Sequence, residues 1–85
     1  MLLKISAFIE DLKEEEANAS SFDAQQLLSI QISKAEAIGS FFFAFHLSIK
    51  IDDLRRAINE ISHKEGYAAE YRRCMETALA ASYPI

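Results

Sequence analysis

The segment from residue 27 to residue 51 constrains the fold most, because its apolar residues fit two periodicities. In steps of three or four they form a stripe along one side of a long helix: Leu28, Ile32, Ala35, Ile38, Phe42, Phe45 and Ile49. In steps of two, Phe43, Phe45, Leu47, Ile49 and Ile51 fit a strand, and residues 28–33 alternate in the same way. The first pattern predicts a helix, and the second predicts a β-hairpin over residues 27–51.

The residues that would connect the two strands favour the helix. Residues 34–37, Lys-Ala-Glu-Ala, are strong helix formers and contain no tight-turn residue. The chain has two Gly and one Pro among its 85 residues, fewer breakers than sandwiches and barrels use. We therefore predict an all-α fold, a small bundle of three to four helices that dimerisation would complete. The alternative is an α+β fold with the hairpin over residues 27–51.

A polar cluster in the N-terminal half of the chain separates two predicted helices. The first helix has its apolar face on Leu2, Ile5, Phe8, Ile9 and Leu12. It is followed by a small polar cluster at residues 18–21, where a Ser side chain can accept the first free backbone N–H groups of the next helix. We expect Gly39 to end that second helix in the left-handed conformation, and a new helix or extended segment to begin at Ser40.

Two more helices are predicted after residue 50. One has its apolar stripe on Ile51, Leu54, Ile58 and Ile61, with two Asp residues near its N-terminus and Gly66 as its stop. The last carries Ala68, Tyr71, Met75, Ala78 and Leu79 on one face, and Pro84 cannot continue it.

Length and cysteine content predict one domain over residues 1–85 in a reducing, cytoplasmic environment. A chain of this size has too little surface to bury in a second core. Its single Cys74 cannot form an intramolecular disulfide. We expect no signal peptide, because Glu10 and Asp11 follow the short apolar start. We also expect no membrane span, because residues 37–49 are shorter than the roughly 18 to 20 residues that a span needs.

Residues that could carry chemistry are few, so we predict a protein that is not an enzyme and holds no metal or cofactor. Cys74 is adjacent to the Met75 face of an Ala-rich helix, where cysteine usually acts as a small apolar filler. Only folding could bring it to His46 or His63, and the spacing of these three residues is not that of a zinc site. The chain has no Gly-rich phosphate loop.

Charge is unevenly distributed along the chain. The net charge is −4, and residues 1–49 hold three Lys against seven acidic residues. An acidic chain repels phosphate backbones, which disfavours sequence-independent nucleic-acid binding. The doublets Arg55-Arg56 and Arg72-Arg73 nevertheless suggest an alternative, a helix-turn-helix-like transcriptional regulator that binds DNA through residues 48–73. Against it, Asp52 and Asp53 would face phosphate, and the usual turn glycine is missing.

The aromatic run Phe41-Phe42-Phe43-Ala44-Phe45 carries the functional prediction. On a helix its rings point in four directions about 100° apart, so one face cannot bury them all. Either this helix is central in the core, or some rings cover a groove on a protein partner or on a second copy. We predict a protein–protein interaction module of the adaptor, chaperone or inhibitor type, whose partner is another protein or a second copy of the chain, and we expect a homodimer. Its expected partner-binding residues are Phe41, Phe42, Phe43, Phe45, Leu47, Tyr67 and Tyr71.

Overall fold

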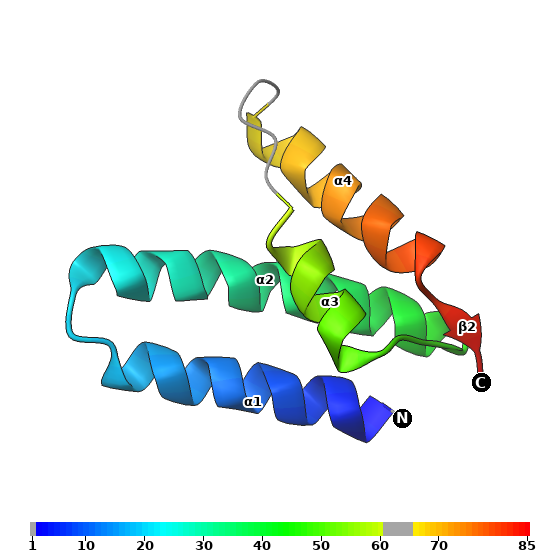
Figure 1. Cartoon of the computed structure of the whole chain (residues 1–85), viewed down its shortest axis with the longest axis horizontal. Helices are drawn as coiled ribbons and strands as arrows, with labels where there is room; N and C mark the ends of the chain where they lie inside the picture. Colours follow the sequence, from blue (N-terminus) through cyan, green and yellow to red (C-terminus); the bar gives the residue numbers. More distant parts are fainter. Residues whose placement is uncertain (1, 61–65) are drawn as a thin grey trace.

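The computed structural model describes residues 2–60 and 66–85, and within them the chain forms helices joined by short connections (Figure 1). The helices are α1 (Leu2–Asn18), α2 (Phe22–Ala44), α3 (Ile51–Ile58) and α4 (Gly66–Ala80). Two short strands, β1 (Leu47–Ser48) and β2 (Tyr83–Pro84), complete the described elements. The all-α prediction is confirmed, and the alternative hairpin over residues 27–51 is wrong, because most of that segment belongs to α2. In the described part of the chain, no helix is long and apolar enough to cross a membrane.

Helices α1 and α2 form an antiparallel hairpin (Figure 1). Most of the predicted helical stripes form its core: Ile5, Phe8, Leu12, Ile32, Ala35, Ile38 and Phe42 are buried, whereas Phe45, which the α2 stripe also included, is 62% exposed. Gly39 lies within α2 and does not end it, which corrects the prediction of a stop there. A Cβ atom at this position would lie 3.2 Å from Cγ2 of Ile5 and 3.9 Å from Cδ1 of Ile9. Gly39 therefore allows α1 and α2 to approach closely.

The chain leaves α2 at a corner formed by His46. This residue adopts a left-handed conformation, with φ of 53°, which is the role predicted for Gly39. The following strand β1 pairs with β2 in antiparallel register, with Leu47 opposite Pro84 and Ser48 opposite Tyr83. The backbone N–H of Ile85 also donates to the carbonyl of His46, at 3.0 Å. The end of the chain is thus attached to the corner that follows α2.

The buried faces of α3 and α4 differ in part from those predicted. In α3, Leu54, Ala57 and Ile58 are buried, and the predicted Ile61 lies outside the described residues. Gly66 has a φ of 83° and is the first residue of α4, whereas α3 already ends at Ile58. The buried residues of α4 are Ala69, Cys74 and Ala78. Ala68 and Leu79, which were expected on that face, are exposed.

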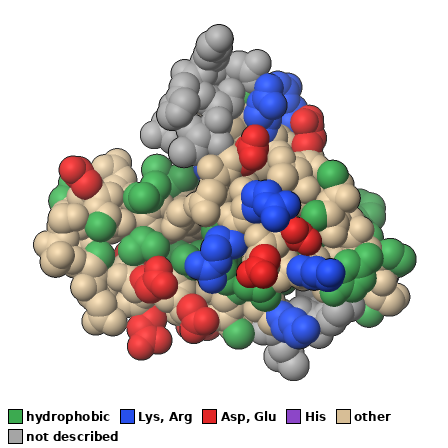
Figure 2. Space-filling view, viewed as in Figure 1, with side chains coloured by type: hydrophobic (Ala, Val, Ile, Leu, Met, Phe, Trp, Pro, Cys, Tyr) green, Lys and Arg blue, Asp and Glu red, His purple; other side chains and the backbone are tan. Residues whose placement is uncertain are grey.

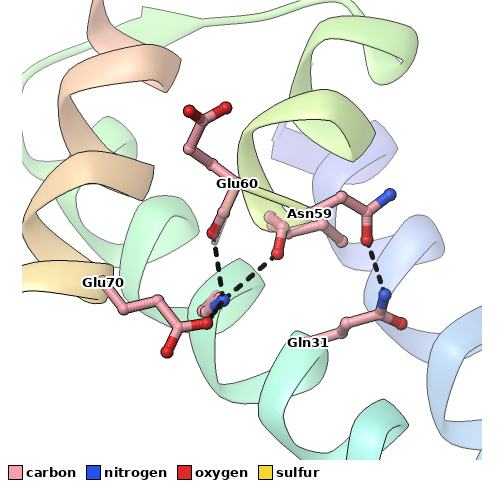
Figure 3. A network of polar contacts seen from close by, with 6 residues as sticks. Gln31, Asn59, Glu60 and Glu70 are labelled. Atoms are coloured by element: carbon pink, nitrogen blue, oxygen red, sulfur yellow. Dashed lines mark hydrogen bonds and ion pairs between the residues drawn. The ribbon is translucent and has the colours of Figure 1, made fainter. Parts of the chain in front are cut away.

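A buried lysine links three of the helices (Figure 3). Lys34 of α2 is only 2% exposed, and its Nζ lies 2.6 Å from Oε1 of Glu70 in α4. Nζ also donates to the carbonyls of Ile58 and Glu60, at 3.4 and 3.5 Å, where α3 ends. A cation is favourable there because the last carbonyls of a helix lack intrahelical partners. Nearby, Nε2 of Gln31 donates to Oδ1 of Asn59 at 2.6 Å.

We expect Ser21→Ala to reduce the free energy of unfolding by about 1 kcal/mol. The Ser21 side chain accepts a hydrogen bond from the backbone N–H of Ala24 at 3.1 Å and caps α2, as the polar cluster predicted. Urea denaturation followed by circular dichroism measures the loss. Ser20→Ala changes an exposed neighbour that does not occupy the cap position, and an equal loss in both variants would contradict the capping role.

We expect Glu70→Ala to destabilise the fold by about 3 kcal/mol, because it leaves the buried ammonium of Lys34 without its carboxylate. The double replacement Lys34→Met with Glu70→Leu removes both charges and should lose less than the single variant. Urea denaturation compares the two. Glu10→Ala is the control, since Glu10 forms an exposed pair with Lys13 at 3.7 Å. A loss for Glu70→Ala no larger than that of the control would contradict the network's role.

Candidate functional site

The aromatic run does not form one surface. Phe42 is fully buried, so its predicted role as a partner-binding residue is wrong, and its ring belongs to the core. Phe41 packs against the core, and its ring stacks on that of Phe45 with centroids 4.5 Å apart. Phe43 and Phe45 are 65% and 62% exposed. Phe43 follows Lys34 by nine residues, or two and a half turns at about 3.6 residues per turn, so it lies on the side of α2 opposite to α3 and α4.

The other predicted partner-binding residues lie away from Phe43. Leu47 is half-buried in β1, where it packs against the core. Tyr71 is half-buried on α4. Tyr67 is on the first turn of α4, and its side chain lies outside the described residues. The structure therefore does not bring the predicted set together, and only Phe43 borders an apolar groove.

This groove, which we call the hairpin groove, runs between α1 and α2 and has a volume of about 490 Å³. Its lining residues are Ile5, Ser6 and Ile9 from α1 and Glu36, Gly39, Ser40 and Phe43 from α2. Gly39 brings the two helices together, so Ile5 and Ile9 form an apolar floor beside the exposed ring of Phe43. Glu36 is the single charged residue of this lining. Sequence reasoning missed the groove; a glycine on the apolar side of a helix was the signal that could have indicated it.

The arginine doublets do not form a continuous basic surface. The guanidinium of Arg55 lies over the ring of Phe8, 5.2 Å from its centroid. Arg56 pairs with Asp53 at 3.5 Å, and Arg72 approaches Glu76 at 4.0 Å, while Arg73 is exposed. Figure 2 shows basic and acidic side chains interspersed on this face of α3 and α4. No observation on the described residues favours the DNA-binding alternative, because the helix expected to read bases has eight residues and carries two Asp in its first turn.

Cys74 lies in the core, 1% exposed. Burial raises the pKa of its thiol from 9.0 to about 11; nearby Lys34 opposes this increase, and Glu70 and Glu60 add to it. His46 is exposed at the corner after α2, and His63 lies outside the described residues. Among the described residues, no three His, Cys, Asp or Glu side chains are grouped so that they could hold a metal ion. The thiol is thus protonated and enclosed, as expected of an apolar filler.

Comparison with known protein families, with curated proteins and with solved structures finds no match to the chain.

We expect iodoacetamide to label Cys74 on the order of 100-fold more slowly in the folded chain than in urea, because both burial and the raised pKa suppress the reactive thiolate. Raising the pH above 9 should further accelerate labelling of the folded chain, because its thiol has a pKa of about 11, whereas labelling of the unfolded chain levels off once the pH passes the ordinary value of 9.0. Mass spectrometry of timed samples measures both rates. Equal labelling rates in the two states would contradict the burial of Cys74.

Proposed function

We propose that the chain is a non-catalytic protein–protein interaction module, of the adaptor, chaperone or inhibitor type, which binds through the hairpin groove. One observation carries this proposal: the Phe43 ring is 65% exposed beside an apolar floor, although the neighbouring Phe42 is fully buried. Burying an aromatic side chain contributes about 1.5–3 kcal/mol. Phe43 is thus able to anchor a helix laid into the groove.

The partner that we propose first is a second copy of the chain. Helices α3 and α4 cover one side of the hairpin, and Phe43 faces the other side. Two hairpins packed through their grooves would form a four-helix arrangement in which the same surface of each copy is buried. Glu36 at the groove would be the main charged group to lose water, and the neighbouring Ser6 and Ser40 are small enough to admit another helix. The buried free thiol of Cys74 suits a cytoplasmic module.

Sedimentation velocity at tens of micromolar tests this function. We expect the wild-type chain to sediment as a dimer and Phe43→Ser to sediment as a folded monomer, because the variant removes the proposed anchor without touching the buried core. Phe45→Ser is the matched control: it removes a similarly exposed ring at the C-cap of α2, outside the lining of the hairpin groove, and should leave the dimer intact. A monomeric wild-type chain, or equal effects of the two variants, would overturn the proposal.

A further inference from the structure

The hairpin of α1 and α2 extends beyond α3. Helix α3 contacts α1 where Arg55 lies over Phe8, and it contacts α2 where Asn59 accepts a hydrogen bond from Gln31. Past these two contacts, α1 continues to Asn18 and α2 starts at Phe22. Figure 1 shows this free end of the hairpin on the left, with α3 and α4 beside its other half. The free end and α3 together form an angle (Figure 1).

A cleft of about 480 Å³ lies in this angle. We call it the end cleft and define it by its lining residues: Phe8, Asp11, Leu12, Glu14, Glu15 and Asn18 from α1, and Arg55 from α3. On α2, Leu27 lies one turn before Gln31, on the strip of the helix that faces α3. Leu27 is 55% exposed. Leu27 is therefore an exposed apolar residue on the same α3 side of the hairpin as the end cleft, although it is not part of the cleft lining.

The charge of the α1 wall is strongly negative. Residues 10–16 contain five acidic residues and one Lys. Three of the acidic residues, Asp11, Glu14 and Glu15, line the end cleft, whereas Lys13 pairs with Glu10 outside it. In the described part of the chain these three carboxylates form no ion pair with a basic side chain. Figure 2 shows acidic side chains gathered at the lower left of the molecule, over α1.

We propose that the end cleft binds a cationic amphipathic helix of a protein partner. Its apolar face would cover Leu27 and the edge of Leu12, and its Lys or Arg residues would reach Asp11, Glu14 and Glu15. A nucleic acid would be repelled by the same carboxylates. A second copy fits less well, because the chain as a whole is acidic, with 13 Asp and Glu residues against 9 Lys and Arg.

This site is independent of the proposed dimer contact. The end cleft includes Arg55 of α3 and therefore lies on the α3 side of the hairpin, whereas Phe43 projects from the opposite side of α2. The binding experiment can therefore use Phe43→Ser as a variant that disables only the hairpin groove. If one of the two proposals fails, the other can still be tested.

Fluorescence anisotropy with the full chain tests the site. The probe is a fluorescein-labelled peptide of about 18 residues, or five turns, with Leu on one helical face and Lys on the other. We expect Leu27→Ser and the pair Asp11→Asn with Glu15→Gln each to weaken its binding about tenfold, because they remove the apolar contact and two charge contacts. Glu10→Gln, which changes an acidic residue of α1 outside the cleft, should change the affinity less than about twofold, and so should Phe43→Ser.

Peptide controls separate docking from charge attraction alone. A peptide of the same composition, scrambled so that Leu and Lys no longer occupy separate faces, should bind at least about tenfold more weakly. Equal binding of the two peptides, or equal weakening by Glu10→Gln and by the paired cleft variant, would show non-specific attraction and overturn the proposal. Absence of binding would overturn it as well, and a change of oligomeric state in Leu27→Ser would then assign the cleft to contacts between copies.

Discussion

The fold depends on how the buried ammonium of Lys34 is satisfied. A charge in the interior is expensive unless every partner is in place, so a buried ion pair defines position more than it adds stability. Here the partners are the Glu70 carboxylate of α4 and two carbonyls where α3 ends. Any packing of α3 or α4 that moved these acceptors would leave the ammonium unpaired. Cys74 follows Glu70 by one helical turn, so the same constraint also directs the thiol into the core.

This constraint divides the surface of the hairpin. Because Lys34 binds α3 and α4 on its own side of α2, the opposite side retains the hairpin groove. Because α3 ends just after it reaches Gln31, the free end of the hairpin stays uncovered on the α3 side. Both candidate surfaces are therefore consequences of two short helices covering part of a long hairpin. The exposed Phe43 and Leu27 lie on its uncovered parts.

The positions of the helices were easier to predict from the sequence than the contacts that individual residues make between helices. Apolar spacing predicted α1 and the core stripe of α2, and the polar cluster predicted the cap at Ser21, because these features depend on neighbours in the chain. Local patterns could not predict the structural roles of Gly39, His46 and Lys34. The role of Gly39 depends on its close approach to Ile5 of another helix. A lysine in a helix-forming segment has the same local sequence pattern whether its side chain is buried or exposed. The strand pattern was correct only where the chain leaves α2, at Leu47–Ser48.

The same limit applies to the candidate site, since exposure of a ring depends on which helix covers it. The local sequence does not distinguish which of the four neighbouring Phe residues could lie at an interface, yet Phe42 is buried and Phe43 is exposed. The arrangement has one further consequence for the proposed module. If two chains pair through their hairpin grooves, their end clefts lie on the outer sides of the dimer, because each cleft is on the α3 side of its hairpin. One dimer would then present two acidic clefts, and a partner with two cationic helices would gain affinity by occupying both.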